Sequence, residues 1–451
     1  MLSIGIIAAN RTKKTTDDYI LASREVGPLA TALSAVSTCH SGFMFIGMIG
    51  FTYTIGISSM WMIFGWLVGD FIAWKWVYPK LRQSSEEQNN LTIPEFVTNH
   101  LPHNKKRMLQ LIIATIIFIF VSLYAAAQLI AGSKALGIFI NLPQEWGIIL
   151  GGSVVLVYSV SGGIRASIWT DVIQSVIMMI AMIGLLITVL VTIGGVTPLF
   201  TMLTKIDPSL ANPFTGFDFG LILYILGWCA FGLGVIGQPH ILTRPMAIKS
   251  TKDLKKSRTI YLSWYMVFSA AAILIGLAAR VLLPELINQD PELGLPLLAL
   301  QYLPTFFVGI ILAGIFSACI STADSQILVC SATITQTFLS NKKQSILASR
   351  ATTLFTLIFI VLFSIFASKS VFFWVILAWS ILALVLSPLV FSQCFNIKLS
   401  QKSIIAVITT SLLFIYWWIF KLELSPTVNE VLPGFIIITV IISLFKIAEK
   451  K

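Results

Sequence analysis

Four small residues in an apolar stretch share one face of a predicted helix. The stretch reads "FSACISTADSQILVC", and the four residues are Ala318, Ser321, Thr322 and Ser325. Their spacing of i, i+3, i+4 and i+7 places them side by side on a helix, and Asp324 borders that face. Hydroxyl and carboxylate oxygens suit a small hard cation rather than zinc or copper. The pattern predicts a cation site, and the alternative is a polar contact between two membrane helices.

A second polar group interrupts an apolar run nearer the N-terminus. The run from Gly27 to Gly56 is long enough to cross a membrane, yet residues 37–42 at its centre read "STCHSG". Gly42 and its small polar neighbours weaken helix formation. Irregular backbone at membrane depth occurs only inside protein or beside water, and the carbonyl groups it frees can coordinate Na⁺. The segment therefore predicts a helix break that builds a binding site.

Another glycine-interrupted span lies five predicted spans later. It reads "GWCAFGLGVIGQPHILTR" and covers residues 227–244, with Pro239 after its last glycine. Two interrupted spans at matching positions in two halves point to the binding site of a secondary transporter.

Two further acids, Asp70 and Asp171, fall within or at the edge of predicted spans. Ionisable groups in membrane segments are costly and are functional candidates. Asp70 has a structural alternative, which is an ion pair with Lys75. Asp171 also has a structural alternative: it would lie in the first turn of a predicted span, where the helix N-terminus stabilises a carboxylate.

Composition assigns the chain to the integral membrane proteins. Of its 451 residues, 57% are hydrophobic and 11% are charged, whereas soluble domains average about 25% charged residues. The five cysteines form no Cys-x-x-Cys pair, so they are expected to be free thiols. No metal-ligand cluster and no nucleophile–base set is evident, so the chain is not expected to be an enzyme.

Apolar windows of about 20 residues predict twelve spans. They are 27–52, 54–79, 108–133, 147–162, 168–195, 218–241, 259–284, 299–338, 349–368, 371–395, 403–420 and 431–447. The apolar residues before Arg11 are too few to span, which indicates a truncated first helix or a start that lies upstream.

The distribution of basic residues predicts the orientation. Most of the 30 lysine and arginine residues lie at one end of the spans; those at the other end are Lys134, Lys205, Arg280, Lys369 and Lys421. The positive-inside rule makes the basic end, and with it the C-terminus, cytoplasmic. The net charge of +11 therefore reflects topology, and no nucleic-acid partner is expected.

Several stretches resemble the sodium:solute symporter family, and its sodium/proline symporter branch in particular. They are "DDYILASREVGPLATALSA" (17–35), "NNLTIPEFVTNH" (89–100), "SGGIRASIWTDVIQ" (161–174), "GQPHILTRPMA" (237–247) and "STADSQILVCSATIT" (321–335). The resemblance implies an all-α membrane protein with a LeuT-like core of two inverted five-helix repeats, at 27–195 and 218–395. Residues 1–26 would hold the truncated helix and a cytoplasmic loop, and residues 396–451 two further helices with a cytoplasmic tail.

The resemblance also implies site residues. For sodium they are Ser37 and His40, through their carbonyl groups, with Ala318, Ser321 and Thr322; for a second cation region they are Asp171, Asp324 and Ser325; for the substrate they are Ser41, Gly42, Phe43, Tyr124, Phe231 and Val235. The helix face found from spacing contains Ala318, Ser321 and Thr322.

The implied activity is import of a small solute, such as the amino acid L-proline, by alternating access across a bacterial inner membrane. Na⁺ is the coupling ion, with no other cofactor and no obligate protein partner. The chain departs from the proline branch, which has Asp where this chain has Cys39, Trp at Phe43 and Phe231, and Tyr at Val235. Asp324 is a candidate for supplying the missing charge. The alternatives are another substrate, a proton-coupled carrier that uses His40, and a solute-sensing membrane domain.

Overall fold

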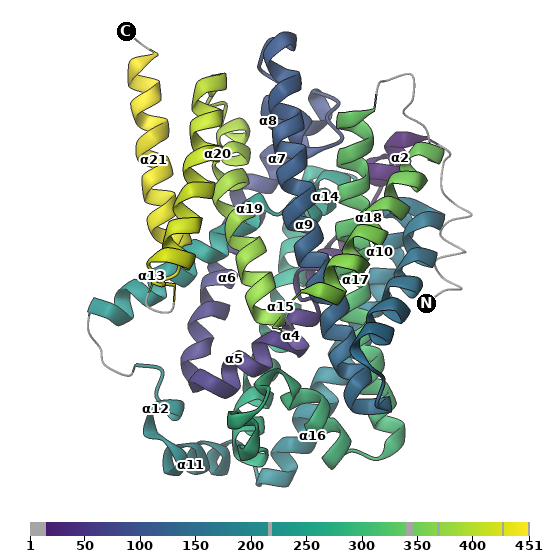
Figure 1. Ribbon diagram of the computed structural model, residues 1–451, viewed down its shortest axis with the longest axis vertical. Coiled ribbons are helices and arrows are strands. Elements are labelled where there is room, and N and C mark those ends of the chain that lie inside the picture. The colour runs from purple at the N-terminus through teal and green to yellow at the C-terminus, as the bar shows by residue number, and fades with distance from the viewer. Residues whose placement is uncertain (1–14, 215–218, 340–345, 368–369, 426–427, 450–451) are drawn as a thin grey trace.

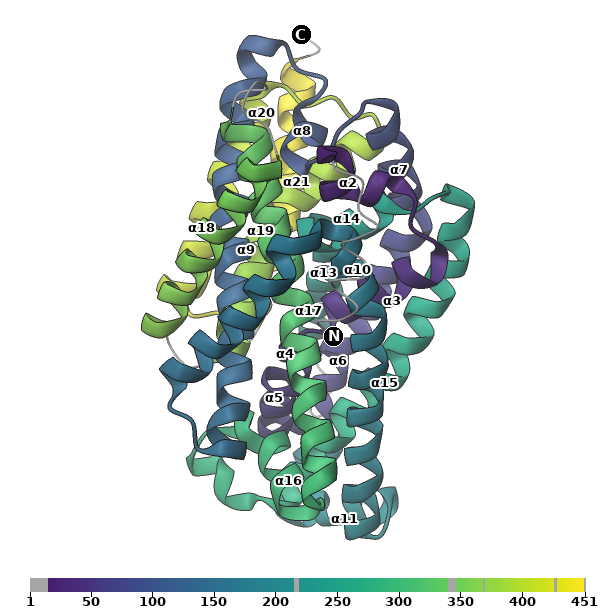
Figure 2. The ribbon, with the colours of Figure 1, turned by 90° about the vertical axis from the view of Figure 1, so that its right-hand side faces the viewer.

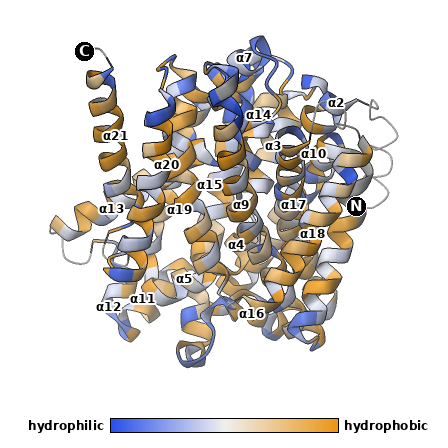
Figure 3. Cartoon of the chain, turned by 45° about the horizontal axis from the view of Figure 1, so that its top comes forward, coloured by the Kyte–Doolittle hydropathy of each residue, from blue (hydrophilic) through white to orange (hydrophobic). Residues whose placement is uncertain are grey.

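The computed structural model describes residues 15–214, 219–339, 346–367, 370–425 and 428–449, so the segment before Arg11 lies outside the described residues. Within these ranges the regular secondary structure is helical, apart from an isolated bridge between Val26 and Ile248. Figure 1 shows the long helices side by side in one bundle. Figure 3 shows hydrophobic residues along the helices and hydrophilic residues gathered towards the two ends of the bundle, as a membrane-spanning protein requires.

The first half of the chain contains the first predicted helix break. Its helices are α2 (Thr16–Leu21), η1 (Ala22–Arg24), α3 (Pro28–Cys39), α4 (Gly42–Phe45), α5 (Gly47–Ile55), η2 (Gly56–Ser59), α6 (Met60–Ile72), η3 (Ala73–Val77), α7 (Tyr78–Glu87), α8 (Ile93–Thr98), α9 (His103–Ile140) and α10 (Gln144–Ile193). The connection to the second half forms α11 (Val196–Ile206) and α12 (Pro208–Ala211).

The second half contains the second break. Its helices are α13 (Phe219–Leu233), η4 (Gly234–Gly237), α14 (Pro239–Ala247), η5 (Thr251–Asp253), α15 (Leu254–Leu282), η6 (Pro284–Asn288), η7 (Pro291–Leu293), α16 (Gly294–Tyr302), α17 (Thr305–Phe338), α18 (Ile346–Phe366), α19 (Val371–Cys394), α20 (Gln401–Ile415), η9 (Tyr416–Lys421) and α21 (Val431–Ala448).

In the described ranges, 10 helices are long and apolar enough to cross a membrane, compared with twelve predicted spans. The difference has two sources. The predicted spans 147–162 and 168–195 both lie in α10, which bends at Gly163 instead of passing through a loop. The break leaves α3 shorter than a full span, while residues 42–87 continue as one helical stretch.

Gly163 makes the bend in α10 possible. Its φ of 57° lies in the region that favours glycine,. A Cβ atom at this position would lie 2.7 Å from both the ring and the carbonyl oxygen of Tyr19. The glycine therefore allows α2 to pack directly against the bend.

Both helix breaks lie inside the bundle. α17 packs along α9 and α10, α6 packs along α13, and α19 covers η4. Figures 1 and 2 show α17 in the interior, close to α10 in both views. Side chains from both halves of the chain therefore surround the interrupted segments.

Candidate functional site

The first break falls at His40 and Ser41, between α3 and α4. His40 leaves the helical conformation with φ −88° and ψ 64°, and the Ser41 hydroxyl accepts the backbone N–H of Phe43 at 3.2 Å. The N–H of Gly42 donates to Oε1 of Gln128 on α9 at 2.9 Å. The predicted break is confirmed, and side chains satisfy backbone groups that a continuous helix would have paired.

Gly42 is required for the contact between α4 and α17. A Cβ atom on Gly42 would lie 2.4 Å from Sγ of Cys319 and 3.1 Å from Oε1 of Gln128. Only a residue without a side chain lets the start of α4 approach both α9 and α17 this closely.

Oxygen atoms from the end of α3 and from α17 meet beside the break. The Ser321 hydroxyl donates to the carbonyl oxygens of Ser37 and Ala318, at 3.1 Å each. The Thr322 hydroxyl donates to the carbonyl oxygen of Thr38 at 3.0 Å and lies 3.5 Å from that of Ser37. Carbonyl and hydroxyl oxygens are the donor set of a small hard cation. Four of the five positions implied for sodium are thus brought together, and Thr38 joins them.

The His40 side chain turns away from these oxygens. Its ring packs against Trp264, Tyr265 and Phe268 of α15, with centroid separations of 5.4, 4.2 and 5.7 Å. Its Nδ1 lies 3.1 Å from the carbonyl oxygen of Val36. The His40 side chain therefore takes no part in the candidate cation site.

The implied second cation region contains the side chain of Arg244. Nη2 of Arg244 lies 3.2 Å from Oδ2 of Asp171, and the same atom donates to the Ser325 hydroxyl. Ser34 donates to Oδ2 of Asp171 at 2.6 Å. Asp324 lies within electrostatic reach of both Arg244 and Asp171. The Arg244 side chain thus supplies a fixed positive charge that balances the Asp171 carboxylate.

The structural alternative considered for Asp171 was wrong, and Arg244 was not foreseen in this region. Asp171 is not in the first turn of a helix, because α10 continues through it and Arg244 balances its charge. Arg244 is 1% exposed, and it also donates to the carbonyl oxygen of His240 at 2.7 Å. The hydrogen bonds and the ion pair offset the cost of burying the guanidinium.

The expected ion pair between Asp70 and Lys75 is absent from the described residues. The Lys75 ammonium lies 4.4 Å from the ring centroid of Trp76, a cation–π contact at the surface,. Asp70 points to the other side of α6, where its Oδ2 accepts the hydroxyl of Tyr261 at 2.9 Å.

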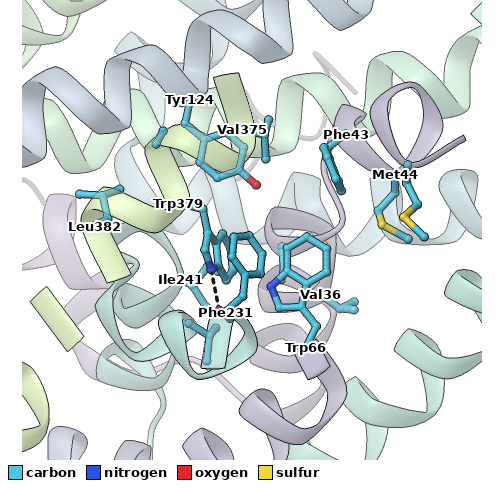
Figure 4. Packing of buried hydrophobic residues seen from close by; sticks show 14 of the residues in the cluster. Val36, Phe43, Met44, Trp66, Tyr124, Phe231, Ile241, Val375, Trp379 and Leu382 are labelled. Carbon is cyan, nitrogen blue, oxygen red and sulfur yellow. Dashed lines mark hydrogen bonds between the residues drawn. The ribbon is translucent and has the colours of Figure 1, made fainter. Parts of the chain in front are cut away.

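Aromatic side chains from five elements meet beyond the break (Figure 4). They are Phe43, Trp66, Tyr124, Phe231 and Trp379. The ring of Trp66 lies 5.7 Å from Phe43, 5.5 Å from Phe231 and 5.2 Å from Trp379, measured between centroids. Phe43, Tyr124 and Phe231, three of the positions implied for the substrate, thus lie together. Trp66 and Trp379 belong to the same cluster but were not among the implied positions.

Some polar atoms in and beside this aromatic cluster have hydrogen-bond partners, and others do not. Nε1 of Trp379 donates to the carbonyl oxygen of Phe231 at 3.0 Å, drawn as a dashed line in Figure 4. Nε1 of Trp66 and Nε2 of Gln128 have no hydrogen-bond partner within the described part of the chain. Buried donors normally have partners, so these two are available to a ligand.

The other three positions implied for the substrate lie at the helix breaks: Ser41 and Gly42 at the first and Val235 at the second. Ser41 lies next to the buried hydroxyl of Tyr124. Val235 is fully buried in η4, and its carbonyl oxygen accepts the N–H of Gln238 at the second break.

Access to the site differs at the two ends of the bundle. A cavity of about 530 Å³ opens at the end that carries Lys134, and Phe51, Glu292 and Phe372 line it. The ring of Phe372 lies 5.7 Å from that of Phe43, so this side chain borders both the cavity and the aromatic cluster. At the basic end, the cavity between α2, α14 and α17 measures only about 20 Å³, and a separate cavity of about 450 Å³ lies beside α8, the start of α9 and the end of α17.

Ion pairs hold α2 against the basic end. Arg165 of α10 pairs with Asp18 at 2.5 Å and with Glu25 at 3.1 Å. Arg24 donates to the carbonyl oxygens of Asn90, at 3.0 Å, and Met246, at 3.0 Å. These contacts close the path beside α2 at the basic end.

Comparison with known proteins agrees with this geometry. A sequence profile described as "Sodium:solute symporter family" matches residues 19–410. The chain is 30% identical to the osmoregulated proline transporter OpuE of Bacillus subtilis, over 97% of this chain and 90% of that protein. It is also 30% identical to the sodium/proline symporter of Escherichia coli, over 100% of this chain and 91% of that protein.

The fold matches that of a structure titled as a Na⁺-coupled sialic acid symporter. The TM-score is 0.81 at 19% identity, and the match covers 98% of this chain and 93% of the other. The expected LeuT-like architecture is confirmed. The expectation that the chain is a transporter and not an enzyme is confirmed as well. Members of this class couple transport to Na⁺ and bind a small solute. With a family profile that covers most of its length, the chain belongs to the sodium:solute symporter family.

Proposed function

We propose that this protein is a symporter that imports L-proline, or another small amino acid, together with Na⁺. The observation that carries the proposal is the meeting of the Ser37 and Thr38 carbonyl groups with the Ser321 and Thr322 hydroxyls. These oxygens lie directly beside a helix break and an aromatic cluster. A broken helix supplies both carbonyl groups for the cation and N–H groups for an anionic substrate.

The aromatic cluster supports a small, partly apolar substrate. Phe43, Trp66 and Phe231 offer ring faces to a pyrrolidine or a short aliphatic side chain. Trp66 Nε1 and Gln128 Nε2 are donors available to a carboxylate. Tryptophan is lacking at positions 43 and 231, where the proline branch has it, and Trp66 and Trp379 bring indole rings to the same place.

We assign the basic end to the cytoplasm of a bacterial inner membrane by the positive-inside rule. The wide cavity would then face outward, and α2 would close the inward path. In the transport cycle the repeats at 27–195 and 218–395 would move relative to each other and open the two paths in turn.

Coupling to protons alone is the second candidate function. His40 gives it little support, because the ring lies among aromatic side chains of α15. Asp324 gives it little more, because it lies within electrostatic reach of the Arg244 guanidinium.

Uptake of labelled proline into proteoliposomes tests the proposal. The vesicles receive an inward Na⁺ gradient or, separately, an inward proton gradient. We expect uptake under the Na⁺ gradient and none under the proton gradient alone. Uptake that needs only protons would contradict Na⁺ coupling. A Na⁺-dependent thermal shift without proline uptake would keep the cation site and reject proline as the substrate.

A further inference from the structure

Asp70 of α6 is a buried carboxylate without a balancing cation. Its side chain is fully buried. Oδ2 accepts the Tyr261 hydroxyl at 2.9 Å, and Oδ1 has no hydrogen-bond partner among the described residues. No lysine or arginine in the described ranges forms an ion pair with it. An isolated charge at this depth is very costly, which marks Asp70 as a functional candidate.

The groups around Asp70 are hydroxyls and a thiol. The titratable side chains that face it are Cys39 of α3, Tyr78 of α7, and Tyr261 and Tyr265 of α15, with the His40 ring behind Tyr265. The Cys39 thiol and the Asp70 carboxylate lie next to the same Tyr261 hydroxyl. This set lacks the several carbonyl and carboxylate oxygens that a metal cation requires. It suits a carboxyl group that binds a proton.

Asp70 and the candidate sodium site lie on opposite sides of α3. Ser37 directs its carbonyl group to Ser321 on α17, whereas Cys39, two residues later, faces Tyr261 and Asp70. One helix diameter, roughly 10 Å, therefore separates the two. With an effective dielectric constant of about 20, a single charge at that distance changes cation binding by roughly tenfold.

We propose that Asp70 is an ion-coupling carboxyl group, protonated in the Na⁺-free protein and ionised when Na⁺ binds on the other side of α3. This inference rests on the proposed Na⁺ site. As Na⁺ enters, the O–H bond of the Asp70 carboxyl group breaks and the proton leaves to solution, so the buried charge changes little. Because linkage is reciprocal, protonation of Asp70 weakens Na⁺ binding by the factor by which Na⁺ favours deprotonation.

Na⁺ titration of the purified full-length protein tests this role. Intrinsic tryptophan fluorescence gives the half-saturating Na⁺ concentration between about pH 5.5 and 8.5, with choline chloride as the salt control. A pH indicator in weak buffer detects protons released when NaCl is added. For the unsubstituted protein we expect proton release and a half-saturating concentration roughly tenfold lower at high pH than at low pH.

Three variants separate a coupling role from a structural one. Asp70→Asn keeps an acceptor for Tyr261, and we expect it to abolish proton release and to hold Na⁺ affinity at the low-pH value. Cys39→Asp combined with Asp70→Asn returns a carboxyl group to the Tyr261 hydroxyl from α3, and both signals should reappear. Asp207→Asn, at the exposed α11–α12 junction, should behave as the unsubstituted protein does.

The two levels of the proposal fail in different ways. Na⁺ binding with no pH dependence and no proton release would overturn the role of Asp70 and leave the Na⁺ site intact. Wild-type behaviour in Asp70→Asn would do the same. Absence of any Na⁺ response at every pH would instead reject the proposed function. Even if Asp70→Asn does not fold, a wild-type titration without pH dependence or proton release overturns the role of Asp70.

Discussion

Two hydroxyl groups on α17 form the side-chain part of the candidate sodium site. Ser321 and Thr322 approach the carbonyl oxygens of α3 at 3.1 and 3.0 Å. When Na⁺ is bound, hydroxyl oxygen atoms and carbonyl oxygen atoms can coordinate it together. We expect Ser321→Ala and Thr322→Ala each to raise the Na⁺ concentration for half-maximal uptake by about tenfold, the effect of about 1.4 kcal/mol.

Ser331→Ala is the matched control for these two substitutions. It removes a hydroxyl from the same helix, but that hydroxyl donates to the carbonyl oxygen of Ser349 on α18 at 2.8 Å. Its Na⁺ dependence should stay as in the unsubstituted protein. Unchanged Na⁺ dependence in both Ser321→Ala and Thr322→Ala would rule out this location for the site.

Arg244 has a different role, because its charge is fixed in the protein. Arg244→Met leaves Asp171 buried without its counter-ion, and we expect a loss of about 3 kcal/mol in the free energy of unfolding. Adding Asp171→Asn removes the unpaired charge, so the double variant should unfold at a higher temperature than Arg244→Met alone. Thermal unfolding in detergent measures both. A double variant less stable than Arg244→Met would show that the ion pair is not the reason for the loss.

The same residues show what the sequence could predict. Ser321 and Thr322 were found from helical spacing, because both contacts depend on one face of one helix. The Asp171–Arg244 and Asp70–Tyr261 contacts were not predicted, and a pair with Lys75 was only the alternative considered for Asp70, because the true partners lie more than 70 residues away. Contacts at such separations depend on how helices pack, which a single sequence does not encode locally.

At the first helix break, the close approach of α4 to α17 depends on Gly42. We expect Gly42→Ala to reduce uptake strongly, since its Cβ would lie 2.4 Å from Sγ of Cys319. Combining it with Cys319→Ala removes the clashing sulfur atom and should restore part of the activity. Gly309→Ala, with nothing within 4 Å of the added atom, is the control. Equal loss in the single and double variants would show that the clash is not responsible.

The two breaks were easier to predict than the partners that hold them. Glycine and small polar residues inside apolar runs revealed both interruptions. Gln128, which accepts the N–H of Gly42, carries no such signal, because one glutamine in α9 has no periodic pattern around it. The bend at Gly163 was expected as a gap between spans, since the composition beside it is polar, but the helix continues on both sides.

On the scale of the whole molecule, the cavity of about 530 Å³ on the Lys134 side and the narrow path beside α2 favour a state open to the Lys134 side. Glu292 reinforces this end: its carboxylate binds Lys134 at 2.6 Å and accepts the N–H groups of Val371 and Phe372 at the start of α19. This contact joins the segment before α16 to α9 and α19. A change of state must therefore move these elements together or break the contact.

Cysteine accessibility tests this asymmetry and the orientation together. Thr54 is exposed in the wide cavity, and Thr333 lines the narrow one. In a Cys229→Ser background, a membrane-impermeant maleimide should label Thr54→Cys from outside the cell and leave Thr333→Cys unlabelled from either side. During proline and Na⁺ transport, Thr333→Cys should become reactive in inside-out vesicles, because alternating access opens the path beside α2. Labelling of Thr333→Cys at rest would contradict the closed inner path. Labelling of Thr54→Cys only from the cytoplasmic face would contradict the assigned orientation.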